Sequence, residues 1–542
     1  MLCVFFAGCA DTNEVQVPRA PDYRKNSKNN KEFTFYAYSS VSTGKQTRKD
    51  ENGNRYTVEL GPDCITLEKF QEYKECGLQI LMPQSLAVVG RPSNYTDPSV
   101  VPLWKTILDL AEQTDLKVIL TDNILMYASS GQYTDAALYE SETAMDKYVR
   151  EQLMLYVQHP AFYGVLLRDE VSAAQIKSGT FGKVYHSIKR VEKALQNEGV
   201  IDKEVFIHIN VRGMGSYFQG YSDHTGDQFP EISREEYYDL LPGLEYKDPA
   251  TETDAAFYAR VDALYAATPS AEKEGLRYVM QRARYRRHLE LLIEATGSNH
   301  FAIDLYPLYQ APMTVYLQSL QIGAEVAEEY GVEYHIVTQA TSFNNGGNTR
   351  ILSAADMRWL NNTLLGYGVS TICYYGYFQP GPTCLEGSSF LLYSGEKTPM
   401  WEACQNLMKE NRAFESTILN FDFKASKGYI KEDATYNAGY VKYLPAVGEF
   451  SVLEDFTWDK ETALVTELYD KKRKNYMYMA FNAVDPIAGT EQFLQTSTLT
   501  FDEKYTSAVV WKNGTSKNVR LSKSNGLTVK NYPGEATYVI PY

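Results

Sequence analysis

The chain has 542 residues, 44% of them hydrophobic and 22% charged, and a formal net charge of −15. This length predicts two or three domains. The acidic balance argues against a nucleic-acid partner, because phosphate recognition needs a basic face, and against binding to an anionic membrane surface.

The N-terminus has the features of an export signal. A short apolar run, Leu2–Gly8, is followed by Cys9, and Phe6-Ala7-Gly8-Cys9 resembles a bacterial lipobox, in which the cysteine becomes the lipidated first residue. Thr12–Glu32 is polar and predicts a disordered tether. No other segment has the roughly 20 apolar residues that a membrane-spanning helix needs. We therefore expect an exported protein, with residues 1–32 as signal and tether, that reaches a membrane at the cell surface only through a lipid on Cys9.

Short apolar strand patterns alternate with helix patterns over the next 380 residues or so, which is about the length and the repeat count of a (β/α)8 TIM barrel. We assign the barrel to residues 33–418. The expected strands are Phe33–Ser40, Leu78–Ser85, Lys117–Asp122, Phe162–Ser172, Glu204–Asn210, His300–Leu308, Val332–Ala340 and Val369–Phe378. The expected helices are Thr66–Gly77, Val101–Asp115, Asp146–His159, Thr180–Asn197, Tyr285–Gly297, Thr314–Gly331, Ser353–Gly368 and Pro399–Phe414.

Two segments depart from this alternation. Residues 211–284 form a connection too long for a structureless loop, and a βα loop projects on the active face of a barrel. We expect this insert to wall or cover the pocket, a decorative insertion being the alternative. After Asn420 the helix patterns stop, and alternating segments separated by turns such as Asn513-Gly514 predict a β-sandwich over residues 419–542.

Polar residues end the expected strands. The apolar run Val165–Leu167 stops abruptly at Arg168-Asp169-Glu170. In a parallel barrel the carboxyl ends of the strands meet on one face, where ligands bind. Carboxylates and amides pair with hydroxyl groups and aromatic rings stack on sugars, so this face suits a carbohydrate. Its residues are Ser39, Gln84, Asp122, Arg168, Asp169, Glu170, Asn210, Asp304, Tyr306, Gln339 and Tyr375.

Other chemistries lack their motifs. The sequence has no HExxH, C-x-x-C, G-x-G-x-x-G or G-x-S-x-G pattern, so we expect no metal, no nucleotide or other cofactor and no acyl-transfer triad. Beyond Cys3 and Cys9, the remaining cysteines are expected to be reduced and buried. They are Cys64, Cys76, Cys373, Cys384 and Cys404.

Two carboxyl groups that flank a glycosidic bond can cleave it, one by protonating the leaving oxygen and the other by attacking or by activating water. Glu170 is the best acid, because the adjacent Asp169 would raise its pKa by like-charge repulsion. Asp304 is the best second carboxylate. Strand alternation predicts Arg168 and Glu170 on one side and Asp169 on the other, unless a bulge intervenes.

A barrel whose fourth strand ends in an acid and which precedes a sandwich resembles the clan A glycoside hydrolases. One further segment resembles the sequence that closes the barrels of these enzymes: Gly395-Glu396-Lys397-Thr398-Pro399-Met400-Trp401. Closer still, the chain resembles bacterial secreted glycosidase-like barrels with Arg-Asp-Glu-Pro on the fourth strand. The matching segments here are Arg168-Asp169-Glu170-Val171, Asp304-Leu305-Tyr306-Pro307 and Thr338-Gln339.

The resemblance implies a glycoside hydrolase acting on oligo- or polysaccharides, with catalytic Glu170 and Asp304. Asp169, Asn210, Tyr306, Gln339 and Tyr375 would bind the substrate.

One departure leaves an alternative open. Clan A enzymes carry a nucleophilic Glu at the end of the seventh strand, where this chain has Gln339, and a glutamine cannot form the glycosyl-enzyme ester. Either Asp304 or Asp169 supplies the second carboxylate, or the protein is a non-catalytic carbohydrate-binding lipoprotein on a degenerate barrel. A solute-binding lipoprotein is disfavoured, because its two lobes do not fit eight sequential βα units.

Overall fold

The computed structural model describes residues 32–83, 101–121, 124–129, 131, 137–214, 229–308, 314–343, 350–379, 384–385, 387–434, 439–488 and 491–542. The predicted Cys9, Gln84 and Asp122 lie outside these residues. No helix of the described part combines the length and the apolar character that crossing a membrane requires.

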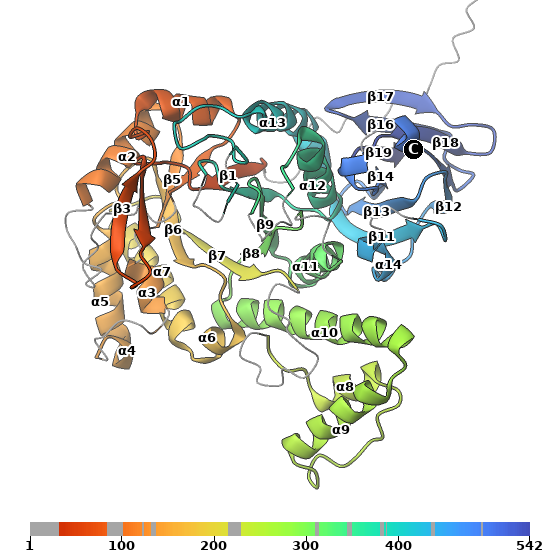
Figure 1. Cartoon of the computed structure of the whole chain (residues 1–542), viewed down its shortest axis with the longest axis horizontal. Coiled ribbons are helices and arrows are strands. Elements are labelled where there is room, and N and C mark those ends of the chain that lie inside the picture. Colours follow the sequence, from red (N-terminus) through yellow and green to blue (C-terminus); the bar gives the residue numbers. More distant parts are fainter. Residues whose placement is uncertain are drawn as a thin grey trace, which may run out of the picture.

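Eight parallel strands close into a barrel in the order β1-β10-β9-β8-β7-β6-β5-β4, which confirms the predicted (β/α)8 fold (Figure 1). The strands are short and largely buried on both faces, although β7 and β9 also carry polar side chains. The strands are β1 (Thr34–Tyr38), β4 (Ile80–Met82), β5 (Lys117–Leu120), β6 (Phe162–Arg168), β7 (Phe206–Arg212), β8 (His300–Leu305), β9 (Glu333–Gln339) and β10 (Thr371–Tyr375).

Helices surround the barrel. Five of them begin at a Ser or Thr whose hydroxyl caps the first turn, namely Thr66, Ser141, Ser172, Ser353 and Thr398. The helices are α1 (Leu67–Glu75), α2 (Val101–Gln113), α3 (Ile124–Ser129), α4 (Ala137–Glu140), α5 (Glu142–Leu153), α6 (Ala173–Lys177), α7 (Thr180–Asn197), α10 (Ser270–Thr296), α11 (Tyr316–Tyr330), α12 (Ala354–Gly366) and α13 (Pro399–Ile418).

Several elements differ from the sequence-based expectation; among them are the short helices α3, α4 and α6, which were not predicted. The third predicted helix starts earlier, because Ser141 caps α5 ahead of Asp146. Helix α10 starts at Ser270 rather than Tyr285, so its first half lies within the predicted insert. A hairpin of β2 (Lys45–Lys49) and β3 (Arg55–Glu59) follows β1 and was not predicted, because neither strand is apolar.

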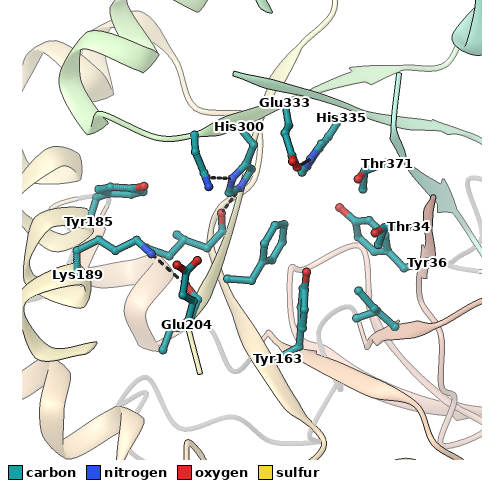
Figure 2. A pocket seen from close by; sticks show the side chains of 15 residues that line it. Thr34, Tyr36, Tyr163, Tyr185, Lys189, Glu204, His300, Glu333, His335 and Thr371 are labelled. Atoms are coloured by element: carbon teal, nitrogen blue, oxygen red, sulfur yellow. Dashed lines mark hydrogen bonds and ion pairs between the residues drawn. The ribbon is translucent and has the colours of Figure 1, made fainter. Parts of the chain in front are cut away.

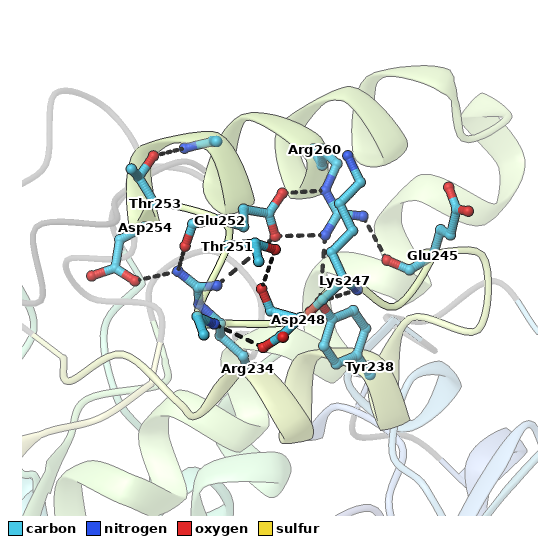
Figure 3. Close-up of polar contacts among 12 residues, drawn as sticks. Arg234, Tyr238, Glu245, Lys247, Asp248, Thr251, Glu252, Thr253, Asp254 and Arg260 are labelled. Carbon is cyan, nitrogen blue, oxygen red and sulfur yellow. Dashed lines mark hydrogen bonds and ion pairs between the residues drawn. The ribbon is translucent and has the colours of Figure 1, made fainter.

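The insert forms a small helical unit with its own apolar core. Helices α8 (Arg234–Leu240) and α9 (Asp254–Ala267) bury Tyr237, Phe257 and Val261 together with Met280 of α10. Figure 3 shows its polar network: Arg260 bonds both oxygens of Glu252 at 2.8 and 2.9 Å. These contacts give the unit a defined structure. Its predicted role over the pocket stays a prediction, because residues 215–228, which join β7 to it, lie outside the described part.

Two antiparallel sheets follow the barrel, as predicted. The first has the order β11-β13-β14-β19-β16-β17 and the second the order β12-β15-β18. Their strands are β11 (Asp422–Ile430), β12 (Leu453–Trp458), β13 (Thr462–Asp470), β14 (Asn475–Asn482), β15 (Gln495–Phe501), β16 (Ser507–Lys512), β17 (Thr515–Arg520), β18 (Gly526–Asn531) and β19 (Ala536–Pro541). Short elements accompany them: α14 (Gly439–Lys442), η2 (Pro486–Ala488) and η3 (Glu491–Phe493).

A buried ion pair links the barrel to the sandwich. Arg350 bonds Asp356 of α12 and, at 2.6 Å, Asp485 of the sandwich. All three side chains are buried, and a charge buried in this way is stable only when it is paired. The ion pair is thus a buried polar contact between the two domains, beside an apolar core that they share. Figure 1 shows the sandwich beside α11, α12 and α13.

The five predicted cysteine thiols are all buried: Cys64, Cys76, Cys373, Cys384 and Cys404.

Candidate active site

The barrel closure brings together side chains from four strand ends. Asp169 and Glu170 follow β6, Asn210 lies near the end of β7, and Asp304 lies near the end of β8. Tyr306 and Tyr375 stand beside them at the ends of β8 and β10. Six of the seven predicted barrel-site residues therefore surround one site, and their roles in chemistry stay predictions.

Asn210 bonds both acidic residues at the end of β6, the carboxylate of Asp169 and the backbone of Glu170. Its Oδ1 accepts the backbone N–H of Glu170 at 3.1 Å, and its Nδ2 donates to Oδ1 of Asp169 at 3.0 Å. The side chain is fully buried, so little freedom remains in this clamp. One amide thus sets the relative position of two neighbouring acids.

The end of β6 is irregular, with a bulge before the two acids and a left-handed residue at the second. Leu166 pairs with His208 and Arg168 with Ile209, so Leu167 is an extra residue between them. The sequence analysis allowed for a bulge, but this one precedes both acids and shifts them together, so the departure from strand alternation between Asp169 and Glu170 lies at Glu170 itself. Glu170 also has a φ of 53°, a left-handed conformation that is unfavourable for a residue other than glycine. Such strain concentrates at functional sites.

Glu170 combines a raised pKa with a cationic partner. Burial and the charge of Asp169 raise the pKa of its carboxyl, while Arg212 lowers it. Nε of Arg212 lies 2.5 Å from Oε2 of Glu170, and the Glu170 side chain keeps 25% of its exposure. Burial and the charge of Asp169 together raise the pKa of Glu170 more than Arg212 lowers it. Glu170 is therefore a carboxyl that can hold a proton and still be reached from outside.

Asp304 lies deeper, with 5% exposure. Burial and then the charges of Asp169 and Glu170 raise its pKa well above the usual range, against hydrogen bonds from Asn210 and Tyr306. The charge of Glu170 is among the charges that raise the pKa of Asp304, so the two carboxyls lie near each other. Two neighbouring carboxyls cannot both ionise readily, and together they hold a proton at a pH where separate acids would have lost it.

Aromatic rings form one wall of the site. The centroid of the Tyr375 ring lies 5.2 Å from that of Tyr306, 5.9 Å from Tyr38 and 5.8 Å from Phe343, with which it stacks. Such a wall can take the apolar face of a sugar ring. Phe343 was not predicted, because it follows the end of β9 and belongs to no strand pattern.

Gln339 is committed to the backbone. Its Oε1 accepts from the N–H of Leu308 at 2.9 Å, and its Nε2 donates to the carbonyls of Leu308 and Thr341 at 2.8 and 3.0 Å. The side chain is fully buried. Gln339 thus ties the loop after β8 to the end of β9, and each of its polar atoms already has a protein partner.

A polar column continues from the site into the barrel. The Tyr38 hydroxyl donates to Asp169 at 3.4 Å and lies 3.2 Å from Nε2 of His208, whose Nδ1 lies 2.9 Å from the Tyr36 hydroxyl. Burial lowers the pKa of His208 to about 3, so its ring is neutral. Sequence reasoning missed His208, although it precedes Asn210 by two residues and so faces the same side of β7.

The opposite end of the barrel holds a cavity of about 180 Å³. It is lined by residues at the strand starts, among them His300, Glu333 and His335 (Figure 2). The rings of His300 and His335 stack at 4.8 Å. This cavity is far along the strands from the acids. Among the described residues, no group of three or more His, Cys, Asp or Glu side chains is arranged to hold a metal ion.

No protein-family model matches the chain, and no curated protein matches it. Solved structures do. The beta-galactosidase of psychrophilic Marinomonas ef1 is 11% identical with a TM-score of 0.35, over 70% of this chain and 60% of its own length. A GH30 endoxylanase from Clostridium papyrosolvens C71 is 10% identical with a TM-score of 0.35, over 94% and 96%. A putative alpha-L-fucosidase from Bacteroides thetaiotaomicron VPI-5482 is 12% identical with a TM-score of 0.37, over 75% and 99%.

Proposed function

We propose that this protein is a glycoside hydrolase that cleaves oligo- or polysaccharides by paired-carboxylate chemistry. The observation that carries the proposal is the grouping of Glu170 and Asp304, two carboxyls with raised pKa values, beside Asp169 and Asn210 at the strand ends of a TIM barrel. The aromatic wall around Tyr375 gives a sugar ring a surface beside these acids.

Glu170 is the proton donor in this proposal. It is the more exposed acid of the pair, so it can reach the leaving oxygen of a bound substrate. Asp304 is the second carboxylate, acting as base or nucleophile once Glu170 has taken the shared proton. Oδ1 of Asp304 is buried and has no hydrogen-bond partner among the described residues, which leaves it available to water or to a sugar hydroxyl. Asp169, Asn210, Tyr306 and Tyr375 hold the substrate, and Gln339 holds the loop that carries Leu308.

The test is hydrolysis of a panel of aryl glycosides by the wild type, by Glu170→Gln and by Asp304→Asn. We expect turnover by the wild type on at least one glycoside and a large loss in both variants. An aryl leaving group with a low pKa needs less protonation, so it should be affected less by Glu170→Gln than one with a high pKa. Unchanged turnover in Glu170→Gln would remove it from the mechanism.

The second candidate is a carbohydrate-binding protein without catalysis. Two observations favour it. Gln339 is engaged entirely with backbone groups. Arg212 is paired with Glu170 and stabilises the ionised form of this carboxyl, whereas a proton donor must be protonated. This candidate predicts heat of binding with an oligosaccharide in calorimetry and no release of reducing sugar. Release of reducing sugar by the pure wild type, lost in Glu170→Gln, would exclude it.

We further propose that the protein is exported and anchored at the bacterial cell surface through a lipid on Cys9, which the lipobox-like Phe6-Ala7-Gly8-Cys9 supports. Labelled palmitate should enter the wild-type protein in bacterial cells and fail to enter Cys9→Ser.

A further inference from the structure

The β-sandwich has a groove between the two strands that end its two sheets. Strand β17 is the last strand of the first sheet and β18 the last of the second. Between them lies a groove of about 460 Å³ that we call the sandwich groove. Its apolar floor includes Val510 and Val529, which are buried, and its sides carry Lys512, Lys517 and Lys530. Figure 1 shows both strands within the sandwich.

The charge around the groove is opposite to that of the chain. From Ser507 to Asn531 there are five cationic residues and no carboxylate, in a chain with a net charge of −15. One of the three groove lysines is already engaged: Lys512 pairs with Glu535 at 2.7 Å and donates to the carbonyl of Lys530 at 2.6 Å. Lys517 and Lys530 are exposed at the groove. The groove therefore presents positive charge to an incoming ligand.

The remaining lining indicates which anion fits. Thr515, Ser516 and Thr528 supply hydroxyls to the groove, and these pair with hydroxyls of a ligand. No lining residue of this groove is aromatic, so a neutral sugar would find no ring to stack on. The apolar floor can take the C–H face of a sugar, and the lysines can take its acidic groups. A groove between two strand edges also suits a chain better than a flat surface does.

We propose that the sandwich groove binds an anionic polysaccharide, one that carries carboxylate or sulfate groups, in a site separate from the barrel. Lys517 and Lys530 contact the acidic groups and the hydroxyl side chains contact the sugar hydroxyls. The site does not depend on the proposed hydrolase activity, and it would deliver or hold the whole protein on an acidic glycan. The interaction is electrostatic at an exposed surface, so salt should weaken it.

The experiment is calorimetry of the full chain with polygalacturonate, with dextran sulfate and with neutral dextran, at low and at high salt. We expect binding to polygalacturonate, dextran sulfate or both, no binding to neutral dextran, and loss of binding at high salt. Binding to only one of the two anionic chains identifies the acidic group. Combining Lys517→Ala with Lys530→Ala should weaken binding about tenfold or more, since two exposed charge contacts are lost.

The matched control combines Lys460→Ala with Lys504→Ala, two sandwich lysines that do not line the groove, and it should bind like the wild type. Circular dichroism should show equal folding of both double variants. The proposal is overturned if the groove variant keeps wild-type affinity, if neutral dextran binds as well as the anionic chains, or if neither anionic chain binds. Binding to phosphatidylglycerol vesicles without binding to polysaccharide would also overturn it, in favour of a membrane.

Discussion

The fourth and seventh barrel strands end in different ways. After β6, Asp169 and Glu170 are partly exposed, are placed by a bulge and a left-handed residue, and share the amide of Asn210. At the end of β9, Gln339 is fully buried and bonds only backbone groups. The first arrangement leaves polar atoms for a ligand at the expense of strain, and the second uses every polar atom for stability. Position on the active face alone therefore does not make a residue part of the chemistry.

The largest effect should come from removing the acid at the β6 end. Glu170→Gln keeps the size of the side chain and a contact for Arg212 but cannot give up a proton. If Glu170 is the general acid, kcat should fall on the order of 10²–10⁴-fold, the range that acid catalysis contributes. Steady-state kinetics on the best aryl glycoside measures this loss. Melting temperature within a few degrees of the wild type would show that folding is intact.

A change of Gln339 at the end of β9 should lower the stability of the protein rather than act on the chemical step. Gln339→Ala removes three hydrogen bonds and leaves buried backbone groups of Leu308 and Thr341 without that partner. At about 1 kcal/mol for each bond, the free energy of unfolding should fall by about 3 kcal/mol. Urea denaturation measures it, and Gln113→Ala on the exposed face of α2 should change it by less than about 0.5 kcal/mol. A stable Gln339→Ala that has lost all turnover would instead place Gln339 in the chemistry.

A substitution of Arg212 tests whether its positive charge controls the pKa of Glu170. Arg212 lowers the pKa of Glu170, so Arg212→Met should raise that pKa further. A general acid works in its protonated form, and activity is lost as the pH rises through its pKa. The alkaline limb of kcat/KM against pH should therefore move to higher pH in Arg212→Met. A limb that stays in place, or moves to lower pH, would mean that another group donates the proton.

The sequence predicted the fold and the residues of the site better than it predicted the geometry of the site. Eight apolar strand runs and the charges after Leu167 sufficed to place Asp169 and Glu170 at a strand end, because this follows from local pattern. The bulge at Leu167, the clamp by Asn210 and the engagement of Gln339 depend on neighbours far away in the chain, such as Leu308, and no local pattern encodes them. Helix α10 began early for the same reason, because its first half packs on α8 and α9.

The smallest effect concerns stability and pH at Asp304. Its pKa is raised in the folded protein, so the folded state binds this proton more tightly than the unfolded state does. The wild type therefore loses stability as the pH rises above the unfolded pKa of about 3.9, until the folded pKa is passed. Asp304→Asn carries no charge at any pH. It should be more stable than the wild type at pH 7, and the difference should shrink toward pH 4 even though turnover is lost at both. Melting temperatures across this range measure the difference, and Asp455→Asn on the sandwich surface is the control. A variant whose added stability grew as the pH fell would contradict a raised pKa of Asp304, and with it the proton that Asp304 is proposed to share with Glu170.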